Sequence, residues 1–166
     1  MTKVTAVDVI CPLWRRLIAL VYDLVAVLAI VMVVGLLCQW ATRGQLITTG
    51  SRVHIAWWYQ PLQATVVAAY FVVSWLRGGQ TLGMRPWRIR VTAGDGGRVS
   101  IRQALVRMLV AALPLMLLLL APVFGLKAAL WSIAGGWVVW FGTALFAPHQ
   151  RALHDLAAAT EIRRVL

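Results

Sequence analysis

Four apolar runs, each of about twenty residues, limit what this chain can fold into. They cover about residues 17–38, 56–76, 104–124 and 128–147. Because a helix rises 1.5 Å per residue, each run is long enough to cross about 30 Å of hydrocarbon. The 166 residues are 61% hydrophobic and 13% charged, which is too apolar for an ordinary soluble domain. The sequence therefore predicts an all-α integral membrane protein, a single domain with four transmembrane helices.

The positive charges predict how these helices are oriented. Of the 16 lysines and arginines, all except Arg43, Arg52 and Lys127 precede the first run, lie between or just inside the second and third, or follow the fourth. Lysine and arginine concentrate on the cytoplasmic side of membranes. We therefore expect a multi-pass protein of the bacterial inner (cytoplasmic) membrane with both termini in the cytoplasm. Membrane topology and anionic lipid headgroups explain this positive charge more simply than nucleic acid does.

Residues 77–103 form the one substantial polar insertion, a loop that we expect to be cytoplasmic. Trp87–Val91 alternates apolar and polar residues as a strand does, and Val99–Ile101 could pair with it across a glycine-rich turn. This pattern predicts a short β-hairpin between the second and third spans. Ser100 and Gln103 have the spacing of a capping box, which predicts that the third helix begins there.

An aspartate lies inside the first apolar run. Asp23 is followed by an uncharged stretch that reaches Cys38, and an ionisable group in hydrocarbon costs at least about 2.5–3.5 kcal/mol on translocon scales. Arg16 shares its helical face but lies about 10 Å away along the axis, too far for a direct pair. We therefore expect Asp23 to pair with a cation from another helix, and Arg107, in the first two turns of the third helix, is the best candidate.

A second acid follows the fourth run. Asp155 should lie on the cytoplasmic surface, level with Arg16, so we expect Arg16 to pair with Asp155 and Arg107 to pair with Asp23 at the inner mouth of the bundle. Three interpretations of this charge cluster follow. It could be a structural clasp that fixes helix register. Asp23 could instead carry a proton or cation, since an intramembrane carboxylate can load and release a proton. The arginines could also bind an anionic ligand or lipid headgroup.

Other chemistry has little support in the sequence. We find no nucleotide-binding loop, no Ser/His/Asp arrangement and no paired catalytic carboxylates, so we expect neither enzymatic activity nor a cofactor. His149 and His154 do not share a helical face, and we expect no metal site there. Cys11 and Cys38 lie at opposite ends of the first run, too far apart for a disulfide.

Three motifs, in order along the chain, resemble those of the RDD family of bacterial membrane proteins, which is named for one arginine and two aspartates. They are Arg16-x-x-Ala19-x-x-x-Asp23; Gly79-Gln-Thr-Leu-Gly-Met84 followed by Arg88-Ile-Arg-Val91 and Asp95-Gly96; and Leu153-His-Asp155 with Thr160 beyond. The resemblance runs from about Leu13 to Val165. Met84 and Pro86 depart from it, since basic or aliphatic residues are commoner there.

The resemblance implies that Arg16, Asp23 and Asp155 are signature residues, and transport, including cation/proton antiport, is the usual suggestion for the family. Our first hypothesis is therefore a small transporter of protons, monovalent cations or another small solute that uses the Asp–Arg cluster. The alternative is a membrane scaffold or an accessory subunit of a larger complex. As partners we expect the lipid bilayer, including anionic lipids, and either further copies of the chain or another membrane subunit.

Overall fold

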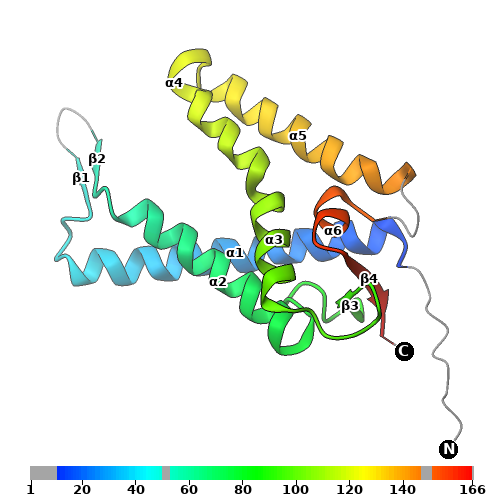
Figure 1. Ribbon diagram of the computed structural model, residues 1–166. Helices are drawn as coiled ribbons and strands as arrows, with labels where there is room; N and C mark the ends of the chain where they lie inside the picture. Colours follow the sequence, from blue (N-terminus) through cyan, green and yellow to red (C-terminus); the bar gives the residue numbers. More distant parts are fainter. Residues whose placement is uncertain (1–10, 50–52, 147–150, 166) are drawn as a thin grey trace, which may run out of the picture.

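Helices occupy the places of all four apolar runs in the structure, a computed structural model that describes residues 11–49, 53–146 and 151–165 (Figure 1). The third run is divided, because α-helical hydrogen bonding gives way to a 3₁₀ helix around Pro114, which has no N–H to donate. The helices are α1 (Leu13–Ala41), α2 (Tyr59–Gly78), α3 (Ile101–Ala112), the 3₁₀ helix η1 (Leu113–Leu120), α4 (Ala121–Phe124), α5 (Leu126–Phe146) and α6 (Leu153–Ala157).

The strand in the polar insertion pairs with a segment that follows the fourth apolar run. Strand β3 (Ile89–Ala93) runs antiparallel to β4 (Thr160–Arg164), close to the end of the described chain. The predicted hairpin between the second and third spans is therefore wrong. Val99–Ile101 cannot supply its second strand, because Ile101 is already the first residue of α3.

The capping box that begins α3 is confirmed. The Gln103 N–H donates to the Ser100 hydroxyl at 3.2 Å, and the Ser100 N–H donates to the Gln103 side-chain oxygen at 3.0 Å. A capped helix start thus occupies the residues that the predicted hairpin required. A second small antiparallel pair, β1 (Ile47–Thr49) and β2 (Val53–Ile55), lies between α1 and α2 and was not predicted.

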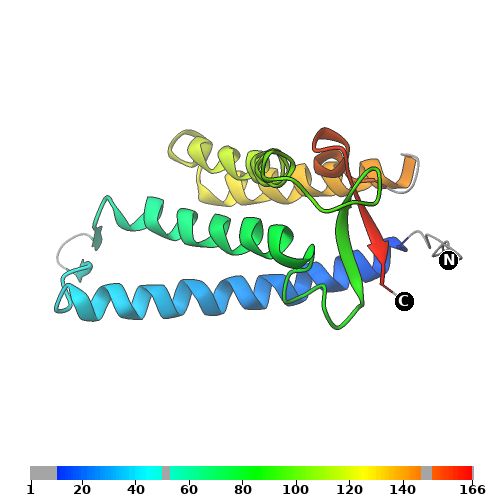
Figure 2. The ribbon, with the colours of Figure 1, turned by 60° about the horizontal axis from the view of Figure 1, so that its bottom comes forward.

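The helices form two hairpins that cross each other. In Figure 1, α1 and α2 form one hairpin, and α3 to α5 form another that passes over it. Figure 2 shows the two hairpins as separate layers. The β3–β4 ribbon and α6 lie where the beginning of α1, the end of α2 and the beginning of α3 meet. We call this region the sheet end; β1–β2 and α4 lie at the far ends of the two hairpins.

Buried apolar side chains gather at the sheet end, whereas the long helices expose theirs. The core cluster includes Ala19, Trp75, Ile89 and Ile162. Along α1, by contrast, Leu36 is 68% exposed, and it has many similarly exposed apolar neighbours. Two runs, α1 and Ile101–Phe124, are long and apolar enough to cross a membrane within the described chain. Apolar surface of this extent is typical of a membrane-type protein and rare in a soluble one.

Candidate functional site

One face of α1 carries the first part of the site. The buried residues of this helix are Arg16, Ala19 and Asp23, whose spacing of three and four places them in a single row. Residues 79–88, the segment between α2 and β3, lie against Ala19 and Asp23 of this row, and we call this segment the strap. The strap therefore covers Asp23.

Two glycines allow the strap to lie so close to α1. Gly79 ends α2 with a φ of +70°, in the left-handed region that favours glycine, and its N–H donates to the Trp75 carbonyl. Gly83 lies against α1, where an added Cβ would overlap the Ala19 carbonyl oxygen and come within 2.8 Å of the Asp23 carboxyl carbon. Only a residue without a side chain fits at Gly83 in this arrangement.

The strap and α2 supply every hydrogen bond that the structure gives to the Asp23 carboxylate. The Thr81 hydroxyl donates to Oδ2 at 2.6 Å, and the Gly83 N–H donates to Oδ1 at 2.9 Å. The Tyr70 hydroxyl, from α2, donates to Oδ1 at 3.0 Å and accepts from the Leu82 N–H. Asp23 itself is only 3% exposed.

The expected pair between Arg107 and Asp23 is therefore wrong. The donors around Asp23 are two hydroxyls and one backbone amide, all of them neutral. Hydrogen bonds of this kind stabilise a buried carboxylate without burying a second ion, which would add its own desolvation cost. The burial of the Asp23 carboxylate is thus offset by hydrogen bonds from neutral groups, and in the described chain it has no fixed positive partner.

The second part of the site is built around Asp155 in α6, which is 0% exposed. Its Oδ1 accepts a hydrogen bond from Nη1 of Arg107 in α3. Its Oδ2 lies 3.7 Å from Nη1 of Arg16 in α1 and accepts from the Ala152 N–H at 3.1 Å. The expected Arg16–Asp155 pair is present, and Arg107 joins the same carboxylate.

Arg107 makes two further contacts that orient it. Its Nη1 donates to the Thr160 hydroxyl at 2.9 Å, and its guanidinium lies 5.1 Å from the centre of the Trp75 ring. A cation over an aromatic face is favourable, the more so where both groups are desolvated. Arg107 therefore connects α2, α3, α6 and β4 around one buried charge.

The electrostatics of this cluster keep Asp155 ionised and its neighbour neutral. Burial alone would raise the pKa of Asp155, but the guanidiniums of Arg107 and Arg16 outweigh it and hold that pKa below its ordinary value. His154 packs edge-on against Phe141, and burial together with the Arg107 charge lowers its pKa to about 4. At neutral pH the cluster thus combines an aspartate anion with an uncharged imidazole.

The two parts of the site belong to one closed ring of contacts. Asp23 holds the strap, and the Gly79 carbonyl at the beginning of the strap accepts from the Val91 N–H in β3 at 2.7 Å. Strand β3 pairs with β4, whose first residue Thr160 binds Arg107. Arg107 binds Asp155, which returns to α1 through Arg16. Displacement of the strap is therefore expected to disturb the Asp155 cluster as well.

The sequence identified the four charged residues but missed most of the groups that hold them. Thr81 and Gly83 were visible as part of the Gly-x-Thr-x-Gly segment, although nothing in that pattern showed that it would reach Asp23. Tyr70 and Trp75 lie in an apolar run and gave no separate signal. The role of Thr160 depends on the pairing of β3 with β4, which the local pattern does not reveal.

The cluster contains no group of residues of the kind that holds a metal ion in what the structure describes. The described segments contain no group of three His, Cys, Asp or Glu residues that could hold a metal ion, and His149 lies outside them. One hollow of about 590 Å³ is lined by Leu126, Lys127, Leu130 and Trp131. It lies at the beginning of α5, at the far end of the second hairpin from the sheet end.

Comparison with known proteins gives one match. The family model described as RDD family matches residues 10–159, which include Arg16, the strap, Arg107 and both buried aspartates. No curated protein and no solved structure matches the chain.

Proposed function

The chain belongs to the RDD family, and from that premise we propose that it is not an enzyme but a small transporter of protons, monovalent cations or another small solute. In this transporter Asp23 binds and releases the ion. One observation carries the proposal. The two buried acids of this membrane-type protein have different kinds of partner: Asp155 lies between two guanidiniums, whereas Asp23 is held by neutral groups.

This difference decides which acid can exchange an ion. Arginine stays protonated in proteins, so Asp155 has permanent positive partners and serves as the structural centre of the cluster. A hydroxyl both donates and accepts hydrogen bonds. Thr81 and Tyr70 can therefore turn their oxygen lone pairs toward a cation bound at Asp23. They can also remain hydrogen-bonded to it when a proton binds instead.

The same geometry supports a position for Asp23 in the membrane. Helix α1 has 29 residues, so it is roughly 43 Å long and exceeds a hydrocarbon core of about 30 Å. The strap covers its beginning up to Asp23, and irregular backbone avoids hydrocarbon. The remaining stretch to Ala41, roughly 27 Å, matches the core. We place Asp23 at the boundary of the core rather than deep inside it.

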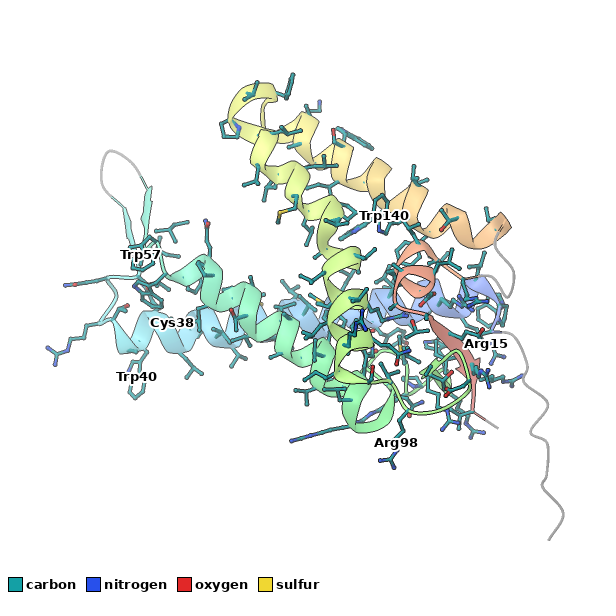
Figure 3. All side chains as sticks on the ribbon, in the orientation of Figure 1. Arg15, Cys38, Trp40, Trp57, Arg98 and Trp140 are labelled. Carbon is teal, nitrogen blue, oxygen red and sulfur yellow. The ribbon has the colours of Figure 1, made fainter. Side chains whose placement is uncertain are left out.

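We further propose four spans, with the sheet end in the cytoplasm of a bacterial inner membrane. The spans would be α1, α2, the run from α3 to α4, and α5, of which α2 and α5 have 20 and 21 residues. Figure 3 shows Arg15 and Arg98 near the sheet end and Trp40 and Trp57 at the opposite end of the α1–α2 hairpin. Among the described lysines and arginines, only Arg43 and Lys127 lie away from the sheet end, which supports this orientation.

The path to Asp23 would open by movement of the strap, or between copies of the chain. Asp23 is almost fully buried beneath the strap in a single chain, and four helices make a thin bundle. Large apolar side chains on the outer face of α1, including Leu24, Val25 and Leu28, are at least half exposed and available to a second copy.

The test is flux in proteoliposomes containing a trapped pH-sensitive dye. Asp23→Asn should abolish the pH change that follows a pulse of Na⁺ or K⁺, while the protein still elutes and melts as a folded species. The matched control is Asp95→Asn, which removes an exposed acid from the turn after β3 and should leave flux unchanged. Wild-type flux in Asp23→Asn would rule out the carrier role.

The second candidate is a membrane scaffold or an accessory subunit. The closed ring of contacts favours it, because every described contact of Asp23 can be explained by holding the strap in place. In that case Asp23→Asn and Asp155→Asn should lower abundance to a similar extent, and no cation should produce flux even with the wild type. Purification in mild detergent would then recover a stoichiometric partner.

A further inference from the structure

Four arginines lie on three segments that meet at the beginning of α1, and we propose that they bind the phosphate headgroup of an anionic phospholipid in the cytoplasmic leaflet. The four are Arg15 of α1, Arg85 and Arg88 of the strap, and Arg164 of β4, which we call the arginine patch. The inference rests on the membrane orientation proposed above and does not depend on ion exchange at Asp23.

Backbone contacts bring together the segments that carry Arg85, Arg88 and Arg164. The Val165 N–H donates to the Arg88 carbonyl at 2.7 Å, so Arg88 and the adjacent Arg164 lie at the same end of the β3–β4 ribbon. The Arg88 N–H donates to the Arg85 carbonyl at 3.1 Å, which closes a turn between them. The charges of Arg15 and Arg164 both act on the fully buried Cys11 thiol, opposing the rise in its pKa that burial causes.

The described acids are all engaged elsewhere. Asp23 and Asp155 are buried in the site, Asp95 accepts from the Gly97 N–H in its own turn, and Glu161 pairs with other arginines of the sheet end. None lies within ion-pair distance of the arginine patch in the described segments. Arginines on neighbouring segments repel one another, and their planar guanidiniums suit phosphate oxygens.

Aromatic rings beside the patch place it at headgroup depth. Trp87 of the strap packs edge-on against Trp14 and Tyr22 of α1, with ring centres 5.7 and 6.4 Å apart. The Arg15 guanidinium lies 5.1 Å from the centre of the Trp14 ring. Trp14 and Tyr22 are about half exposed, and rings of this kind concentrate where the bilayer meets water.

Two features favour a lipid over free phosphate. Leu17 of α1 and Leu82 of the strap are about half exposed and can contact acyl chains. The indole N–H of Trp87 and the Nε of Arg15 are buried without a hydrogen-bond acceptor in the described chain. Unpaired buried donors are costly, so a small side-chain rotation that brings them to phosphate or glycerol oxygens is favourable.

The test uses the full chain reconstituted in vesicles of equimolar phosphatidylcholine and phosphatidylglycerol, followed by native mass spectrometry of the lipids retained. The double variant Arg85→Gln/Arg88→Gln should retain phosphatidylglycerol on the order of tenfold less than the wild type. The matched control is Arg98→Gln/Arg102→Gln, which removes two exposed charges at the start of α3 and should retain it like the wild type.

Three results would overturn the inference. The wild type could retain phosphatidylcholine as well as phosphatidylglycerol, or both double variants could lose lipid equally, as expected for a uniform charge effect. Excess inorganic phosphate could also displace the lipid and remain bound in its place. Melting curves establish that each variant is folded. If the strap variant is not folded, Arg15→Gln/Arg164→Gln provides the same comparison.

Discussion

Replacement of Gly83 by alanine should separate the strap from α1. An added Cβ would overlap the Ala19 carbonyl oxygen and come 2.7 Å from the Asp23 backbone nitrogen, whereas ordinary contacts begin at 3.4 Å. The closer contact with the Ala19 carbonyl oxygen sets the movement of the strap at about 1 Å, which stretches the Gly83 N–H bond to Asp23 from 2.9 Å well beyond the usual limit of a hydrogen bond.

The expected loss of stability follows from the hydrogen bonds between the strap and Asp23 that would weaken. A hydrogen bond to a charged group contributes about 1.5–3 kcal/mol, and the Thr81 bond should weaken as the strap shifts. We expect Gly83→Ala to lower the free energy of unfolding by about 2–3 kcal/mol. For a chain of this size that corresponds to a fall in Tm of roughly 5–10 °C.

The assay is a thermal melt of purified protein in a mild detergent. Gly78→Ala is the matched control, because a Cβ at the last residue of α2 meets nothing within 4 Å and alanine favours the helix. Its Tm should stay within about 2 °C of the wild type or rise slightly. A Gly83→Ala protein that melts like the wild type would refute the close approach of the strap to α1.

Two further predictions concern the Asp155 cluster. Asp155→Asn leaves the Arg107 charge buried without its anion and should lower the free energy of unfolding by about 3–5 kcal/mol. The measurement is the amount of folded protein that can be extracted, which should fall for Asp155→Asn but not for the exposed-site variant Asp95→Asn. His154 has a folded pKa of about 4, below its ordinary 6.5, so between these values the unfolded chain binds a proton that the folded chain does not. Stability should therefore fall by about 2 kcal/mol from pH 7 to pH 5, and His154→Gln should remove that part of the pH dependence of Tm; an equally steep pH dependence in the variant would contradict the buried neutral imidazole.

Local patterns predicted the elements that depend on local physics. The apolar runs gave the positions of the helices, and the Ser100 capping box gave the beginning of α3. The strand at Trp87–Val91 was also recognised, since β3 covers Ile89–Ala93. Its partner was not, because β4 lies far along the chain, beyond two helical runs. Alternation of apolar and polar residues shows that a strand exists but carries no information about a distant partner.

In the charged site, too, the sequence predicted some contacts and missed others. Helical spacing placed Arg16 and Asp23 on one face of α1, and the pair between Arg16 and Asp155 was predicted and is present. Arg107 was assigned to the wrong acid, because sequence gives a residue's depth along a helix but not the direction in which that helix crosses its neighbours. The neutral donors around Asp23 were missed for a related reason, since charge is visible in a sequence and a converging backbone amide is not.

The sequence by itself determined that this is a membrane-type helical protein and that Asp23 would be buried, because hydrophobic length and the cost of an ion in an apolar setting are properties of single segments. Only the tertiary structure decided that Asp155 takes two guanidiniums and that Asp23 is held by Tyr70, Thr81 and Gly83. Those contacts join segments far apart in the chain. Their geometry depends on how closely the strap can approach α1, and a glycine at one position sets that distance.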